Sequence, residues 1–343
     1  AAILGLADPD HYVDRQRALK FAAMYIGEDP EAPNWDAEHK IIRSPINGSA
    51  GPCLEMKWED WVTHRDNLSP YLAPYQDIPG HESGDPFVKL DWSDDKVYAK
   101  ILQTMNERMV PGDVPLNLNA TSLVTNAYLY TDDDKYKQWV LDYLQAWMDR
   151  AAANGGLIPD NVGPTGKIGE RMGGKWWGGY YGWRWPHGGW VMLEAMCNAG
   201  CNATLLTGDP SWLDLFRSQA DRLWEMRRVE QGQIMIPNKH GDQGWFEFIP
   251  HTSGPTLRLL MHAYAVGRQQ QDLDRIQEQY GDRPLPKDQP LPGCGKAGSF
   301  HIHEWFEYMV GCNPDFPERA LEITCAEMRR RLDRIDSETL DWT

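Results

Sequence analysis

The segment LYTDDDKY at residues 129–136 recurs as LLTGDPSW at residues 205–212, 76 positions further along the chain. The alignment pairs two threonines and two aspartates, namely Thr131 with Thr207 and Asp133 with Asp209. In each copy a helix rich in small residues reaches a tight Asp/Gly/Pro turn, and a helix with larger apolar residues follows. Such a pattern is typical of antiparallel helical hairpins, so the chain contains an internal repeat of helix pairs.

Apolar residues at three- and four-residue spacing extend this pattern over most of the chain, whereas alternating strand patterns are scarce and short. A fainter third copy of the turn, MVGCNPDF, occupies residues 309–316. The sequence therefore predicts a fold dominated by α-helices. The segments with helical spacing are residues 12–25, 93–109, 119–131, 134–152, 188–207, 210–228, 253–280, 301–311 and 315–335.

Repeated hairpins with long insertions rich in Gly and Trp favour a closed ring over an open solenoid of short repeats. On this hairpin pattern the chain resembles the (α/α) toroid of carbohydrate-active enzymes, and it looks most like the polysaccharide lyases. The resemblance covers most of residues 90–335 and implies inner and outer helices around a central cleft. It rests on the hairpins and the aromatic loops, since no diagnostic catalytic motif of a family is present.

Two parts of the chain are expected. Residues 1–90 are predicted to hold one helix and Pro-rich loops that pack on the ring, and residues 91–343 to form the (α/α) toroid. One continuous domain is the alternative. The sheet domain that is usual in such lyases is not apparent, so it is expected to be absent from this chain.

Composition excludes several functional classes. A formal net charge of -16 over 343 residues argues against nucleic-acid binding, because phosphate neutralisation needs a basic surface. No apolar run is long enough for a membrane span. The six cysteines have no CxxC spacing, which favours structural thiols over metal ligands. The oligomeric state is left open, as is the localisation, with a secreted or periplasmic protein favoured.

In a ring whose first helices are the inner ones, the loops that enter those helices open on the same rim. Four such loops carry polar residues, and these are expected to meet at one mouth. Helix N-termini in this arrangement also favour a bound anion. The residues concerned are Asn117, Asn119, His187, His251, His301 and His303.

A long insertion, GGKWWGGYYGWRWPHGGW at residues 173–190, leads into the second of these helices and contains five of the 16 tryptophans. Its rings offer flat faces for sugars, and its basic residues can pair with carboxylates. The sequence therefore predicts an acidic poly- or oligosaccharide as the ligand, although structural packing of these rings is an alternative. The expected binding residues, beside Asn117 and His251, are Arg171, Lys175, Trp176, Trp177, Trp183, His240 and Trp245.

Carboxyl groups are scarce on the expected rim, whereas His, Tyr, Asn and Arg are abundant. A glycosidase needs two carboxyl groups, and β-elimination from a uronate needs the other set of groups. A polysaccharide lyase is therefore predicted. Arg184 and Asn119 would bind the substrate carboxylate, His187 or His303 would take the C5 proton, and Tyr181 would protonate the leaving oxygen.

Three alternatives stay open at this point. The first is a glycoside hydrolase of the toroid type that uses Glu170, Asp160 or Glu304. The second is a noncatalytic glycan-binding protein, and the third is a metal held by His301, His303 or His240. No metal and no cofactor are expected. Tyr180 could exchange roles with Tyr181, and the pair His240 and Asp242 could equally belong to a hydrogen-bonded turn.

Overall fold

The computed structural model describes residues 12–44, 47–48, 51–59, 69–70, 72–84, 88–187, 189–251, 255–280 and 304–337. Helices make up 55% of the structure and strands 10%, so the prediction of a helix-dominated fold is confirmed. Within the described ranges, no helix combines the length and the apolar character that a membrane crossing requires.

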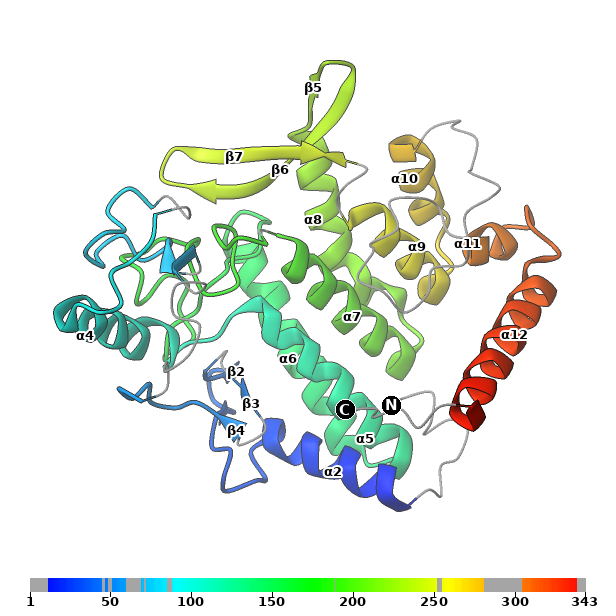
Figure 1. Ribbon diagram of the computed structural model, residues 1–343, viewed down its shortest axis with the longest axis horizontal. Coiled ribbons are helices and arrows are strands. Elements are labelled where there is room, and N and C mark those ends of the chain that lie inside the picture. The colour runs from blue at the N-terminus through cyan, green and yellow to red at the C-terminus, as the bar shows by residue number, and fades with distance from the viewer. Residues whose placement is uncertain are drawn as a thin grey trace.

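The helices follow one another as antiparallel pairs that stand in a row (Figure 1). In the first three pairs the first helices pack directly against one another, with α7 between α5 and α9. Their partners α6, α8 and α10 form a second layer. The bounds of the pairs are α5 (Ala120–Thr131) with α6 (Asp134–Ala153), α7 (Trp190–Thr207) with α8 (Asp214–Glu225), α9 (Thr256–Gly267) with α10 (Gln270–Tyr280), and α11 (Glu304–Met309) with α12 (Phe316–Ser337).

The two copies of the sequence repeat make the same turn. The hydroxyl of Thr131 donates to the carbonyl of Ala127, and the hydroxyl of Thr207 donates to that of Ala203. Asp133 then accepts the backbone N–H two residues later at 3.0 Å, and Asp209 does so at 2.9 Å. Both helices end in a residue of left-handed conformation, Asp132 or Gly208. The repeat in the sequence is thus a repeat of capping chemistry.

One further turn of this kind, at Arg268, was not anticipated. The segment 253–280 was expected to be one helix, but Arg268 adopts a left-handed φ of 52° and divides it into α9 and α10. The N–H of Arg268 donates to the carbonyl of Tyr264, which closes α9 in the same way as the first two turns. The sequence here lacks the Asp of the other copies, so the helical spacing of its apolar residues predicted one continuous helix.

Ion pairs connect the helices of the second layer. Arg217 of α8 donates to both carboxylate oxygens of Asp272 of α10, at 2.8 and 2.7 Å, and both side chains are almost completely buried. Arg275 of α10 makes a similar two-bond contact with Asp221 of α8. Because the guanidinium fork matches a carboxylate in only one geometry, these pairs fix the register between neighbouring hairpins.

Two apolar cores lie within the chain. The larger is formed by the helix pairs together with α2 (Tyr12–Ile26), which packs along α5. The smaller surrounds α4 (Asp95–Thr104) and the π-helix at Met105–Met109, and it includes residues on both sides of position 90. Tyr180 and Trp185 of the long insertion complete this smaller core. The insertion therefore lies between the two cores.

The remaining elements are short, apart from one hairpin. An antiparallel sheet of three strands lies over the N-terminal end of α7, and this sheet was not predicted. Its strands are β5 (Arg228–Glu230), β6 (Gln233–Gly241) and β7 (Gly244–Pro250). The other short elements are β1 (Trp35–Asp36), β2 (Ile41–Ile42), β3 (Asn47–Gly48), β4 (Gly51–Pro52), and the 3-10 helices η2 (Pro115–Asn119) and η3 (Pro210–Leu213).

Candidate functional site

One buried carboxylate organises the long insertion. Asp160 is fully buried and accepts backbone hydrogen bonds from Gly178, Gly179 and Trp183 at 2.7 to 2.9 Å, and a fourth from the Asn161 amide at 3.0 Å. A side chain at Gly179 or Gly182 would collide with it, which explains two of the glycines in this segment. Burial raises the pKa of Asp160, while the four donors oppose that rise. With every lone-pair direction filled, Asp160 positions the loop and has no free oxygen for catalysis.

The folded insertion meets the β6–β7 hairpin in an aromatic cluster. His240 lies at its centre, with ring centroids 4.6 Å from Trp176, 5.6 Å from Trp177 and 5.0 Å from Trp245. Trp183 packs edge-on against Trp245 at 5.1 Å and is completely buried. Burial lowers the pKa of His240, with Asp242 opposing, so the imidazole is neutral near pH 7. The cluster brings together five of the nine binding residues expected from the sequence.

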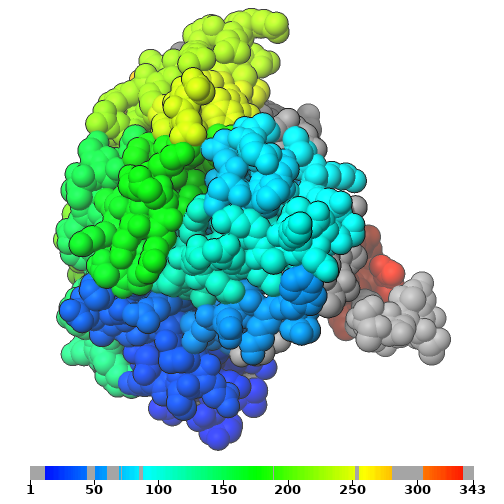
Figure 2. Space-filling model, turned by 90° about the vertical axis from the view of Figure 1, so that its left-hand side faces the viewer, coloured from blue at the N-terminus to red at the C-terminus, as the bar shows by residue number. Residues whose placement is uncertain are grey.

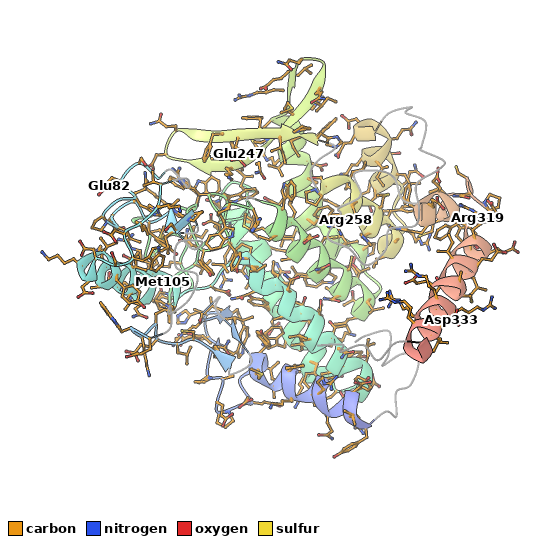
Figure 3. The ribbon with its side chains drawn as sticks, viewed as in Figure 1. Glu82, Met105, Glu247, Arg258, Arg319 and Asp333 are labelled. Atoms are coloured by element: carbon orange, nitrogen blue, oxygen red, sulfur yellow. The ribbon has the colours of Figure 1, made fainter. Side chains whose placement is uncertain are left out.

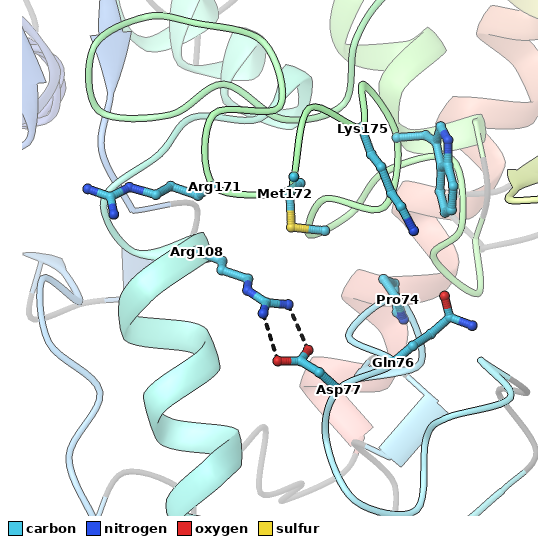
Figure 4. Close-up of a pocket in the computed structure, with 9 residues that line it drawn as sticks. Pro74, Gln76, Asp77, Arg108, Arg171, Met172 and Lys175 are labelled. Atoms are coloured by element: carbon cyan, nitrogen blue, oxygen red, sulfur yellow. Dashed lines mark hydrogen bonds and ion pairs between the residues drawn. The ribbon is translucent and has the colours of Figure 1, made fainter.

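A pocket of about 300 Å³ opens beside this cluster (Figure 4). On the side of the molecule shown in Figure 2, the segment that precedes α4, the green insertion and the yellow hairpin adjoin one another. The pocket is mixed in character, with three cationic side chains, one carboxylate and an apolar wall. Its lining residues are Pro74, Gln76, Asp77, Arg108, Arg171, Met172, Gly173, Lys175 and Trp177.

Arg171 and Lys175 were expected to bind substrate, and both line this pocket. Lys175 donates to Asp242 at 2.8 Å and lies 4.8 Å above the centre of the Trp177 ring. Arg108 and Asp77 were not expected, because each comes from a segment without a recognisable motif. Their bidentate contact, with two distances of 2.7 Å, joins the π-helix to the loop at residues 74–78.

The residues predicted to perform catalysis make separate contacts in the structure. Arg184 donates to the carbonyl of Gly84 and lies over the ring of Phe246, whereas His187 is exposed. Tyr181 has a left-handed φ of 56° and packs against Tyr180 and Trp185 in the smaller core. His303, like His301, lies outside the described residues.

The remaining predicted rim residues hold the fold together. Asn117 is buried and donates to Asp113 and to the carbonyl of Ile42. His251 is buried between α8 and α10, where it contacts the Gln279 amide of α10 at 3.2 Å and the Trp224 ring of α8. The common mouth expected for the rim loops therefore does not include these two residues.

Asn119 instead points to a different surface. Its side-chain oxygen accepts a hydrogen bond from Asn198 of α7 at 2.9 Å. Ten of the 18 residues of α7 are buried, and four of the other eight form a row at spacings of four. That row is Trp190, Glu194, Asn198 and Asn202.

The exposed row of α7 continues onto its neighbours. Glu194 forms an ion pair with Arg258 of α9, and one turn later on α9 the ring of His262 packs 5.2 Å from Trp305 of α11. Asn202 donates to Thr121 and Ser122 of α5. We refer to the surface formed by Asn119, Trp190, Glu194, Asn198, Arg258, His262 and Trp305 as the inner-helix face.

The sequence analysis missed most of this face. The sequence of α7 nevertheless indicates this face, because polar residues at every fourth position of an otherwise small and apolar helix mark an exposed stripe. Partial burial and the charge of Arg258 both lower the pKa of His262, so a neutral imidazole lies beside the Trp305 ring.

No three His, Cys, Asp or Glu side chains among the described residues come close enough together to hold a metal ion. His240, which was considered as a ligand, is surrounded by tryptophans instead. The free cysteines of the described part are Cys53, Cys197, Cys201, Cys312 and Cys325.

Sequence comparison assigns the chain to a family. Its residues 2–235 and 225–343 match the family described as "Domain of unknown function (DUF8034)". The chain belongs to this family. No curated protein matches the chain.

Among solved structures, a glycoside hydrolase family 76 mannosidase, Bt3792 from Bacteroides thetaiotaomicron VPI-5482, is similar at 13% identity and a TM-score of 0.32. The match covers 94% of the DUF8034 chain and 85% of that chain. At this TM-score the similarity does not extend to individual residues.

The prediction of a polysaccharide lyase is wrong by this comparison, because the similar structure is a hydrolase. Arg184 and Asn119, which were predicted to bind one carboxylate, have different partners: Arg184 donates to Gly84, and Asn119 accepts from Asn198 of α7.

Proposed function

We propose that this DUF8034 chain is a carbohydrate-processing enzyme of the glycoside hydrolase type, with its active site on the inner-helix face. The observation that carries the proposal is the row of α7. Among the residues of α7 that are not buried, four lie at spacings of four and form a stripe with a tryptophan, a carboxylate and two amides. These groups suit a saccharide, because sugar rings stack on tryptophan and sugar hydroxyls pair with amides and carboxylates.

Hydrolysis of a glycosidic bond requires two carboxyl groups, one on each side of the bond. Glu194 is our candidate for the carboxylate that attacks or activates water, since it is partly exposed and Arg258 fixes its position. Glu304 is the candidate for the second carboxyl group. It precedes Trp305 on α11, and Arg319 of α12 (Figure 3) forms an ion pair with it at 2.6 Å.

The other carboxyl groups considered for a hydrolase fit less well. All four hydrogen-bonding directions of Asp160 are occupied by backbone and amide donors. Glu170 accepts two hydrogen bonds from Thr165 within its own loop and packs against Gly163. Both groups therefore support the shape of the insertion.

The side chains around Glu194 would bind the sugar. Trp190 is 37% exposed and lies one turn before Glu194 on the same stripe. Asn198 lies one turn after it, and its hydrogen bond to Asn119 orients both amides. A saccharide chain along α7 would thus meet an aromatic ring, a carboxylate and amides in succession.

The proposed function includes an arrangement of the helices and a charge of the substrate. The row of helix pairs would form part of an (α/α) toroid, with α5, α7 and α9 as inner helices. The saccharide would be acidic, which is supported by the three cations that line the pocket of a chain whose net charge is -16.

The test is a panel of neutral and acidic polysaccharides incubated with the protein, with new reducing ends as the readout. We expect at least one to be cleaved, and the Glu194→Gln protein to lose at least about 100-fold in rate. Glu225→Gln is the matched control, since Glu225 pairs with Arg222 on the outer helix α8. Binding without cleavage would select a noncatalytic glycan-binding protein and would overturn the proposal.

A further inference from the structure

The pocket beside the aromatic cluster is separate from the inner-helix face. Its lining comes from the loop at residues 74–77, from Arg108 at the end of the π-helix, and from residues 171–177 of the insertion (Figure 4). None of its lining residues belongs to α5, α7 or α9. About 300 Å³ is at the lower limit of small-molecule sites and suits a ligand the size of one sugar unit.

One end of the pocket has a prearranged donor and acceptor pair. Arg108 donates to both oxygens of Asp77 (Figure 4). Lys100 approaches the same carboxylate at 3.2 Å. Although burial opposes it, hydrogen bonding to Arg108 and Lys100 lowers the pKa of Asp77, which is therefore ionised near neutral pH. A fixed carboxylate next to a guanidinium matches two adjacent sugar hydroxyls, each of which both donates and accepts.

The other polar feature is Lys175, which reaches toward Pro74 and Gln76 in Figure 4. Asp242 and the ring of Trp177 hold its ammonium group in place. Both side chains of the Lys175–Asp242 pair are nearly half exposed, at 43% and 48%, so this ion pair is weak. Lysine has three N–H donors, and a ligand anion can therefore share the ammonium group with Asp242.

Apolar surface lies between the two polar ends. Pro74 and Met172 line the same pocket, and Met172 is central in the close-up. Such a surface fits the C–H face of a sugar ring, and the flexible thioether can adapt to it. The pocket is thus polar at two ends and apolar between them.

We propose that this pocket is a second saccharide site, which binds one sugar unit bearing a negatively charged substituent. Two adjacent hydroxyls of the unit pair with Asp77 and Arg108, and its carboxylate or sulfate pairs with Lys175. The proposal rests on the proposed function only in taking a saccharide as the ligand. In a longer chain this site would anchor the polymer while another segment lies on the inner-helix face.

The experiment is calorimetric titration of the Glu194→Gln protein, so that cleavage plays no part. The probes are tetragalacturonate, a sulfated disaccharide from chondroitin and neutral galactotetraose. We expect at least one acidic probe to bind about 10-fold more tightly than the neutral one. Lys175→Met should abolish that preference, whereas Lys167→Met, a charge loss at an exposed position that precedes the insertion, should preserve it.

A second variant tests the hydroxyl clamp. Asp77→Asn should weaken the acidic and the neutral probe alike by about 10-fold, and a thermal melt shows whether the variant is folded. If it unfolds, Gln76→Ala on the same wall replaces it. Equal affinities of the Lys175→Met and unmodified proteins, or no binding of any probe at millimolar concentration, would overturn the proposal. Either result would leave the cleavage assay of the inner-helix face unaffected.

Discussion

Replacing Asp160 with asparagine should destabilise the protein strongly, because an amide of the same shape cannot accept the four hydrogen bonds that the carboxylate accepts. One carboxylate oxygen serves Gly178 and Trp183, and the other serves Gly179 and Asn161. Whichever oxygen becomes the amide nitrogen, two buried donors then lack an acceptor. A buried unsatisfied donor costs about 1–3 kcal/mol, so the free energy of unfolding should fall by roughly 2–6 kcal/mol.

Urea unfolding followed by circular dichroism measures this loss. Since domains are typically stable by about 5–15 kcal/mol, the transition midpoint should move well outside the error of the method. Glu225→Gln is the control with the same chemical change on an exposed ion pair, and it should cost at most about 1 kcal/mol. A loss of less than about 1 kcal/mol for Asp160→Asn would refute the view that this carboxylate organises the insertion.

Three further outcomes follow from the structure. Asp133→Ala and Asp209→Ala should each lower the free energy of unfolding by about 1 kcal/mol, since both aspartates cap equivalent turns; unequal losses in urea titrations would contradict the structural repeat. Gly182→Ala should destabilise by several kcal/mol in the same assay, because its methyl group would collide with the buried carboxylate of Asp160; a loss below about 1 kcal/mol would show that the loop can move aside. Burial raises the pKa of Asp113 to about 6, although attraction by Arg150 opposes the rise. The protonated Asp113 therefore contributes its full share to the free energy of unfolding below about pH 4, and this share is lost as the pH rises through 6. The difference in unfolding free energy between the unmodified and Asp113→Asn proteins should shrink over that range, and a difference that grows would contradict the assignment.

The helix pairs could be predicted because their signals are local. The Thr–x–Asp turn fixes the end of one helix and the start of the next, and the capping bonds of Thr131 and Asp133 involve residues within four positions of each other. Where this signal is missing, as at Arg268, the prediction failed. The left-handed conformation there depends on the packing of α9 against α10, which the sequence does not display.

The candidate site was only partly predictable for a related reason. Composition identified the tryptophans of the insertion, and the structure places Trp176, Trp177 and Trp245 together around His240. Composition could not show that Asp77 and Arg108, which are 31 positions apart, form one hydrogen-bonded pair. Contacts of that kind depend on how the two cores pack, and no periodicity in the sequence records them.

The row of polar and aromatic residues on α7 could have been predicted from the sequence. Trp190, Glu194 and Asn198 follow one another at spacings of four in a helix of small and apolar residues. The sequence analysis placed the functional residues in loops, because loops commonly carry them. In a layer of packed helices, the side chains that are left uncovered carry equivalent information.

The most direct test of the account is the release of reducing ends from a polysaccharide by the unmodified protein, compared with Glu194→Gln and Glu225→Gln. The account predicts cleavage by the unmodified protein and by Glu225→Gln, and a loss of at least about 100-fold in rate for Glu194→Gln, with its melting temperature nearly unchanged. Full cleavage by Glu194→Gln, or no cleavage of any polysaccharide by the unmodified protein, would contradict the claim that the inner-helix face is a hydrolytic active site.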